Sequence, residues 1–345
     1  MTQLASSPPV RPRRRFARIA IERTLLAVSA LVCLGLLSSR LWPVEWIGCG
    51  GVRGAGTWLA FMGRTFAFHG AVATVVVGGL GLMMGKRLPI VLAVASVALA
   101  WPEVRVLWPR SAPEATATSP HLRVMSMNLL FTNREREAVL RAIEREDPDV
   151  ILLQEYHLGW DAALRARLAA RYPFACTPLE GGMFGQAVYS KRSWTREPEM
   201  LRLTSADYCP QIGVTFDVGG RALTIWNVHT ASPSSAMAIT RQREQVERLG
   251  ELSSRGGALV IMGDFNSTPA SWNADLMRAR GFTEANAAVG AGRGATWPDV
   301  TPLRYLPGVR IDNAWGKGVA WRSSKVVEER TGSDHRAIVV EVGVE

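Results

Sequence analysis

Cysteine is scarce in this sequence, with 4 among 345 residues, and only Cys176 and Cys209 lie in the C-terminal two thirds. No two cysteines have the close spacing of a structural zinc site or a thiol redox motif, which argues against both kinds of chemistry. Cys176 and Cys209 both lie beside predicted strands. They form a disulfide if this region faces an oxidising compartment, or they remain two buried thiols.

An excess of positive charge is also missing from most of the chain. The formal net charge is +10, but residues 1–118 hold 13 Lys and Arg against 4 Asp and Glu, and the rest holds 27 against 26. A domain that binds duplex nucleic acid usually carries a positive excess of its own. The basic pI is therefore weak evidence for nucleic-acid binding by residues 119–345. No internal repeat is present.

The N-terminal third is apolar after a basic start. Residues 1–20, rich in Pro, Ser and Arg, are predicted to be disordered. Three charge-free stretches follow at 24–39, 65–85 and 88–102, with 16, 21 and 15 residues. A membrane-spanning helix needs about 20 residues, so the second stretch is long enough and the others are short. We expect about three transmembrane helices in 21–108. The alternatives are a cleaved signal peptide for the first stretch and a buried helical core for all three.

The basic residues predict the orientation of these helices. The N-terminal arginines and the Lys86-Arg87 pair lie on one side if the first two stretches cross, and Lys and Arg favour the cytoplasmic side. A third crossing places the following region outside the cytoplasm, and without it that region lies inside. We therefore predict a multi-pass protein of the inner or plasma membrane, a linker at 109–120, and an extracytoplasmic domain at 121–345.

Strand and helix patterns alternate in residues 121–345, which predicts an α/β or α+β domain. Buried strands are expected at 122–127, 150–154, 174–177, 186–190, 211–217, 222–227, 258–262, 309–311 and 337–342. Helices are expected at 134–146, 161–171 and 235–252, and from Ser271 onward.

Polar residues recur where these strands end or begin. The run Gly263-Asp264-Phe265-Asn266 follows the 258–262 strand and sets a carboxylate and a carboxamide two residues apart. Alone, such a run is equally typical of an Asx-turn. Seven polar positions accompany it or stand at other strand ends, namely Asn128, Glu155, His229, Asn266, Asp312, Asp334 and His335. Because a sheet holds its strand-end loops in fixed positions, this recurrence predicts one shared site.

The motifs Met127-Asn128, Leu153-Gln154-Glu155, Asn227-Val228-His229, Gly263-Asp264-Phe265-Asn266, Arg310-Ile311-Asp312 and Gly332-Ser333-Asp334-His335 resemble the endonuclease/exonuclease/phosphatase superfamily. The resemblance covers about residues 121–345, in the family's order. It implies two packed mixed β-sheets flanked by helices, a four-layer sandwich. It also implies metal-dependent hydrolysis of phosphoesters.

The resemblance assigns metal-binding roles to Glu155 as the primary ligand, to Asn128 beside it, and to Asp334, which contacts the metal or orients its neighbour. A site of carboxylates and carboxamides suits Mg²⁺ or Mn²⁺. No other cofactor is implied.

The resemblance also assigns catalytic roles. Asp264 orients or deprotonates water, or contacts a second metal, and Asn266 holds the phosphate or the attacking water. His229 donates to a phosphoryl oxygen. His335 is the other central histidine, and Asp312 fixes the state of one imidazole. Which histidine acts as acid and which as base stays open. Trp297, before the 309–311 strand, is interpreted as core packing.

Taken together, the sequence predicts a membrane-anchored phosphoesterase, with phosphodiesters of nucleic acid or phospholipid headgroups as substrates and membrane lipid around the N-terminal helices. The alternative is a non-catalytic member of the same fold that acts as a binding or sensor module. The oligomeric state is left open.

Overall fold

The structure is a computed structural model that describes residues 12–108, 119–179, 184–207 and 210–345. Of the residues 1–20 predicted to be disordered, 1–11 lie outside these residues and 12–20 are helical. Most of the predicted linker and Cys209, whose pairing with Cys176 was left open, also lie outside them. The chain divides into two compact units. The helical unit comprises Met1–Trp42 and Phe66–Trp101, and the sheet unit comprises Pro43–Thr65 and Pro102–Glu345.

The helical unit contains α1 (Pro12–Leu41), α3 (Ala67–Met83) and α4 (Leu88–Leu99). Among the described residues, one helix is long and apolar enough by itself to cross a membrane, over Phe16–Leu41, with a mean hydropathy of 1.9. Its 26 residues extend about 39 Å, against a hydrocarbon layer of about 30 Å. Two further spans exist only if each bent pair of helices counts as one.

The length of the charge-free runs was therefore a wrong guide to the spans. The stretch at 65–85 is interrupted, because one helix ends at Thr65 and α3 begins at Ala67 with only 17 residues. The first stretch is extended instead, because α1 continues through charged residues. The side chains of Arg18 and Glu22 pair across one helical turn at 3.2 Å, which suits a helix surface.

The sheet unit contains two six-stranded mixed sheets, which confirms the predicted fold. The first sheet has the strand order β11-β12-β1-β2-β4-β3, with bounds Val319–Val326, Ile338–Val344, Leu122–Asn128, Val150–Gln154, Gln186–Ser190 and Phe174–Cys176. The second has the order β5-β6-β7-β8-β10-β9, with bounds Arg196–Leu201, Gln211–Asp217, Ala222–His229, Ala258–Asp264, Asp312–Lys317 and Thr283–Glu284.

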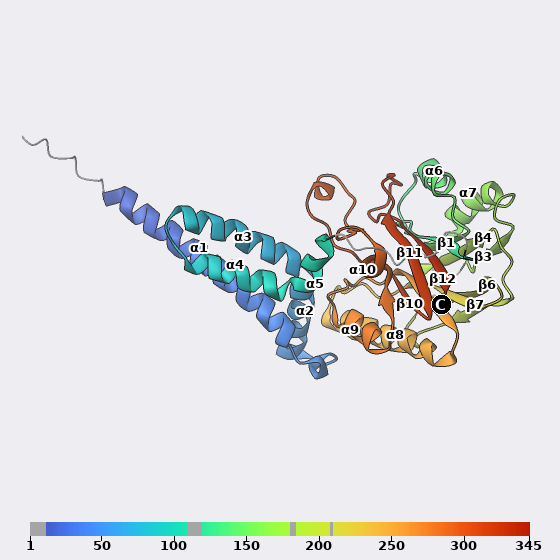
Figure 1. Ribbon diagram of the computed structural model, residues 1–345, viewed down its shortest axis with the longest axis horizontal. Coiled ribbons are helices and arrows are strands. Elements are labelled where there is room, and N and C mark those ends of the chain that lie inside the picture. The colour runs from blue at the N-terminus through green and yellow to red at the C-terminus, as the bar shows by residue number, and fades with distance from the viewer. Residues whose placement is uncertain (1–11, 109–118, 180–183, 208–209) are drawn as a thin grey trace, which may run out of the picture. The chain divides into compact units, whose positions relative to one another are not determined.

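Helices cover the outer face of each sheet, so the unit has four layers (Figure 1). The first sheet packs against α6 (Arg136–Glu146) and α7 (Leu158–Leu168), and the second against α8 (Ala236–Glu251) and α9 (Trp272–Ala279). Side chains along β2 alternate between the two faces of the sheet. Leu152 packs between the sheets, and Ile151 packs toward the helices. A short helix, α10 (Ala285–Val289), follows β9.

Strand register brings the predicted polar residues to one edge. Parallel β7 and β8 set His229 opposite Asp264, and antiparallel β10 sets Asp312 opposite Asp264 on the other side. In the first sheet, parallel pairing sets Asn128 opposite Gln154, directly before Glu155. The two sheets therefore contribute to the same edge.

Several element boundaries differ from the prediction, and two of the differences have a local reason. The strand expected at 309–311 does not form, since Val309 makes only an isolated bridge to Trp297, and Asp312 begins β10 instead of following a strand. The helix expected from 161 begins at Leu158, because the His157 ring Nδ1 accepts a hydrogen bond from the Gly159 amide at 3.0 Å and caps it.

Helix α2 (Gly51–Thr65) belongs to the sheet unit, although its residues fall in the predicted membrane region. The Trp58 indole donates to the Pro233 carbonyl at 3.0 Å, and Arg64 pairs with Asp275 on α9 at 2.8 Å. Phe61 is buried, with its ring centroid 6.2 Å from that of Trp272. These contacts fix one face of α2 on the outer helices of the sheet unit.

Candidate active site

Asp264 lies at the centre of the edge, with its side chain 1% exposed. Its Oδ2 accepts hydrogen bonds from the side-chain amides of Asn128 at 3.1 Å and Asn266 at 3.2 Å. The same oxygen lies 3.6 Å from Nε2 of His229 and 3.8 Å from Nε2 of His335. One carboxylate thus joins residues from four separate segments of the chain.

Burial raises the pKa of Asp264 above its ordinary value, with the His335 charge opposing and the Asp312 carboxylate adding to the rise. A carboxylate in such a place is stabilised by nearby positive charge. The site therefore favours a cation close to Asp264.

Gly263 allows β8 to approach β7 this closely. Its φ is +152°, and a Cβ at this position would lie 2.0 Å from the Val228 carbonyl oxygen. A side chain would therefore push the two parallel strands apart. The glycine of the sequence motif is explained by this contact, which sets the spacing between His229 and Asp264.

Asn128 links Asp264 to Glu155. The Asn128 amide nitrogen donates to Glu155 Oε1 at 3.0 Å, while its Oδ1 accepts from the Leu130 amide at 2.9 Å. Glu155 Oε2 accepts from the Phe131 amide at 2.6 Å. Asn128 therefore presents its nitrogen to two carboxylates, and its oxygen faces them only if the amide turns over. Glu155 has a φ of +56°, a left-handed backbone that aims its side chain at this edge.

His335 and Asp312 form a buried pair, with the ring Nδ1 2.9 Å from Asp312 Oδ2. Burial alone would lower the pKa of His335, but the Asp312 and Asp264 carboxylates overcome it and raise the pKa to about 10. His335 is thus an imidazolium at neutral pH. The Thr296 hydroxyl accepts from the Asp312 backbone amide at 3.2 Å and helps to place the pair, a contact with no signal in the sequence.

His229 faces Asp264 from β7. Its backbone amide donates to Gln211 Oε1 at 2.7 Å, and Gln186 donates to the same oxygen at 2.8 Å. Its ring packs beside Phe184, with the centroids 6.1 Å apart. Within the described residues, the ring Nδ1 is buried and has no hydrogen-bond partner. Neither Gln211 nor Gln186 was predicted as part of the site.

Asp334 stands at the border of the site. Its Oδ2 accepts from the Trp297 indole at 3.1 Å, so Trp297 does more than pack in the core. Its Oδ1 is buried and has no partner among the residues that the structure describes. The Asp334 charge also contributes to the raised pKa of His335. All eight predicted residues thus meet at one edge, with Asp334 joined to the others by charge rather than by hydrogen bonds.

The residues present fit a hard divalent cation. The described groups of ligand type within 4.8 Å of one another are Asp264, Asp312 and His335. Of these, only Asp264 was predicted to contact a metal, as one of its alternative roles. The Nδ1 atom of His335 is held by Asp312, so only its Nε2 faces Asp264. Glu155 and Asp264, bridged by Asn128, supply the carboxylate oxygens that Mg²⁺ and Mn²⁺ prefer.

The sequence matches the model of the "Endonuclease/Exonuclease/phosphatase family" over residues 125–335, more than half of the chain. The chain belongs to this family. The match spans the site residues from Asn128 to His335. It supports a phosphoester hydrolase. No curated protein matches the sequence.

Solved structures share this family fold at low identity. An endonuclease/exonuclease/phosphatase from Bacteroides vulgatus has a TM-score of 0.56 at 17% identity, covering 65% of this chain and 99% of that chain. Humanized D. rerio TDP2 has a TM-score of 0.54 at 15% identity, with the same coverage. D. rerio TDP2 complexed with single-strand DNA product has a TM-score of 0.52 at 14% identity, again with 65% and 99% covered.

Proposed function

We propose that this protein is a membrane-anchored phosphodiesterase that depends on a divalent cation. The observation that carries the proposal is Asp264, whose buried carboxylate contacts Asn128, Asn266, His229 and His335 at one edge of two sheets. These groups offer negative charge, neutral donors and an imidazolium within one small space. Hydrolysis of a phosphoester can use all three, to hold a cation, position the phosphoryl group and protonate the leaving oxygen.

His335 acts as the proton donor in this proposal. Asp312 and Asp264 keep it protonated. Asp312 holds the Nδ1 atom of the ring, and the other nitrogen, Nε2, faces Asp264. It neutralises a phosphoryl oxygen or gives its proton to the leaving oxygen. Asp264 orients the attacking water and accepts its proton. Asn266, anchored by its bond to the Thr230 carbonyl at 3.0 Å, fixes the Asp264 carboxylate.

A cation bound at Glu155 and Asp264 would offset the negative charge of the phosphoryl group. Asn128 keeps these two carboxylates together, and Asp334, with one buried oxygen that has no described partner, is a further candidate ligand. Mg²⁺ and Mn²⁺ are the proposed ions.

Nucleic acid and phospholipid headgroups are the two proposed substrate classes. The likeness to a TDP2 structure that holds a single-strand DNA product supports the first. The apolar Phe16–Leu41 helix supports the second, because an anchor at a bilayer keeps the domain near lipid. We place the site on the extracytoplasmic side, following the distribution of Arg and Lys in the sequence.

The test is hydrolysis by the full chain in detergent. A generic phosphodiester, a phosphomonoester, plasmid DNA and sphingomyelin are compared, with Mg²⁺, with Mn²⁺ and with a chelator. We expect metal-dependent turnover of the diester, and the best natural substrate then identifies the class. Asp312→Asn should lower kcat/KM by about 10²–10⁴, since it removes the carboxylate that charges the donor.

Arg221→Gln, an exposed position on the turn between β6 and β7, is the matched control and should leave kcat/KM unchanged. Equal turnover in Asp312→Asn and the control would contradict the proposed roles. No turnover on any substrate, with a folded chain that binds the cation, would favour a binding module over an enzyme.

A further inference from the structure

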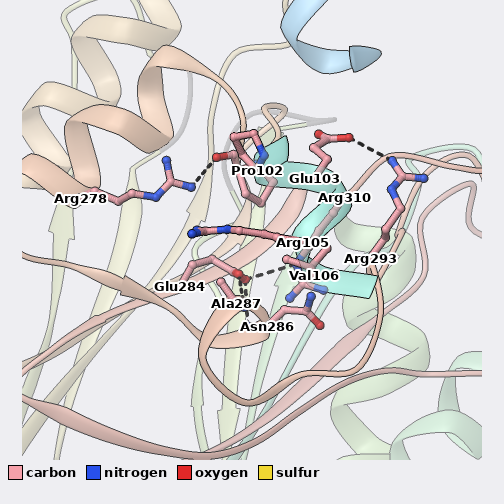
Figure 2. Close-up of a pocket in the computed structure, with 11 residues that line it drawn as sticks. Pro102, Glu103, Arg105, Val106, Arg278, Glu284, Asn286, Ala287, Arg293 and Arg310 are labelled. Carbon is pink, nitrogen blue, oxygen red and sulfur yellow. Dashed lines mark hydrogen bonds and ion pairs between the residues drawn. The ribbon is translucent and has the colours of Figure 1, made fainter. Parts of the chain in front are cut away.

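We propose that an arginine-lined pocket beside β10, outside the candidate active site, binds a phosphate-bearing anion. The pocket is a shallow one, with a cavity volume of about 30 Å³ inside an open space of about 450 Å³ that includes its mouth. Figure 2 shows the side chains around it. The charged residues that line it are Arg105, Arg278, Arg293, Arg310, Glu103 and Glu284.

The pocket carries an excess of positive charge, with four guanidinium groups against two carboxylates. Both carboxylates are engaged. Glu103 accepts from Arg293 at 3.2 Å, and Glu284 accepts from Arg310 at 3.2 Å as well as from the backbone amide of Ala287 at 2.6 Å. The lining residues therefore carry two more positive than negative charges, and Asp275, which lies outside the lining, pairs with Arg278 at 3.0 Å and offsets one of them.

Arg310 supplies a buried donor that has no acceptor. Its side chain is 3% exposed, its Nε donates to Glu284, and its Nη1 donates to the Gly294 carbonyl at 3.0 Å. Its Nη2 is buried and has no partner among the described residues. A buried donor without an acceptor is costly, so an oxygen entering the pocket would be favoured at this nitrogen.

Two further arginines stand close enough to repel each other. Burial lowers the pKa of Arg278, and the charge of Arg105 lowers it further. The Asp275 carboxylate opposes this shift only in part. Arg105 is exposed, and within the described part of the chain only its backbone carbonyl makes a hydrogen bond, which it accepts from the Trp108 amide at 3.4 Å. An anion between these two side chains would relieve their repulsion.

Phosphate suits this arrangement better than a single carboxylate. It offers several oxygens to guanidinium groups that approach from different directions, and each guanidinium can donate two parallel hydrogen bonds. The ligand has two possible sources. Residues 102–107 directly follow the last helix of the helical unit in the chain, which allows a phospholipid headgroup, and a soluble phosphate is the other source.

Arginine-specific labelling of the full chain tests the proposal residue by residue, independently of turnover. Phenylglyoxal modification of Arg105 and Arg278 is measured by peptide mass spectrometry, with Arg221 as an internal control. One arm adds inorganic phosphate to the protein in neutral detergent, against chloride at equal ionic strength. The other compares nanodiscs of phosphatidylglycerol with nanodiscs of phosphatidylcholine.

We expect modification of Arg105 to slow roughly tenfold at about ten times the dissociation constant, while Arg221 is unaffected. Protection by inorganic phosphate alone would assign a soluble ligand, and protection by phosphatidylglycerol would assign a headgroup. Arg278→Gln should remove the protection of Arg105, and Arg221→Gln should retain it. Unchanged modification of Arg105 in both arms would overturn the proposal.

Discussion

Asn128 shows how one amide controls two acids. With its oxygen engaged by the Leu130 amide, its nitrogen is directed at both Glu155 and Asp264, and it keeps two carboxylates close together that would otherwise repel. A cation held by these carboxylates would take over this role. The site therefore holds two carboxylates whose negative charge is only partly offset by groups of the protein itself.

Charge also governs stability away from the site, at Glu341 on β12. Burial alone would raise the pKa of Glu341, but hydrogen bonds from Ser323 and Arg123 overcome it and lower the pKa below its ordinary value of 4.5. Arg123 lies 2.7 Å from this carboxylate. A carboxyl group with a lower pKa in the folded state stabilises the fold above its unfolded pKa. That contribution is lost as the pH falls through the folded pKa.

We therefore expect Glu341→Gln to reduce the free energy of unfolding by about 1 kcal/mol at neutral pH. The difference from wild type should shrink as the pH falls below 4.5. Urea unfolding followed by tryptophan fluorescence at a series of pH values measures it. Glu328→Gln, at an exposed position, is the control and should match wild type throughout. If the difference in free energy of unfolding between Glu341→Gln and wild type stayed constant well below pH 4.5, this account would be refuted.

At the scale of elements, most central strands were predictable, and three of the four edge strands were not. β2, β4 and β6 have the predicted bounds, because each is buried and reads as an apolar run. Of the strands that were not predicted, β5, β9 and β11 are edge strands, and β5 has no buried residue. The fourth, β10, lies between β8 and β9, and the prediction placed a strand just before it, at 309–311. An edge strand lacks the continuous apolar pattern that marks a buried one.

The same limit applies to the site. Each predicted residue belongs to a short motif next to a predicted strand. Trp297 was interpreted as core packing, and Thr296 and Gln211 were not assigned to the site. All three reach the site only through the pairing of distant segments. Local pattern therefore finds the residues that carry charge, whereas the neutral residues that position them depend on tertiary structure.

The close packing of β7 and β8 gives a prediction at this scale. Gly263→Ala should destabilise the sheet unit by about 3 kcal/mol, the upper end for overpacking, because the new Cβ meets the Val228 carbonyl oxygen. Activity should fall together with stability. Urea unfolding is the measurement, and Gly50→Ala, where a Cβ meets nothing within 4 Å, is the control with no expected change. Equal stability of the two variants would contradict the packing account.

At the scale of the whole molecule, the sheet unit is built from two separate stretches of sequence. Residues Pro43–Thr65 pack on it through α2, although the two stretches of the helical unit lie directly before and after them in the sequence. A fragment that begins at residue 119 therefore lacks the partner of Trp272 and Asp275. The predicted domain begins at residue 121, whereas the compact unit also includes Pro43–Thr65 and begins its second stretch at Pro102.

A synthetic peptide of residues 43–65 should bind such a fragment and stabilise it. At about 100 times its dissociation constant, the expected gain is about 2.7 kcal/mol, seen as a rise in Tm. A peptide with Phe61→Ala and Arg64→Ala is the control, because it removes the ring contact with Trp272 and the pair with Asp275. Identical Tm values with both peptides would show that α2 contributes nothing to the sheet unit.

The packing of α2 has a consequence for shedding by proteases. A single cut between residues 109 and 118 breaks the covalent path to the helical unit. The severed domain would still hold α2 through Trp58, Phe61 and Arg64, and α2 continues into the helical unit on both sides. Proteolysis at that stretch would leave the domain attached, and release would require this contact to dissociate as well.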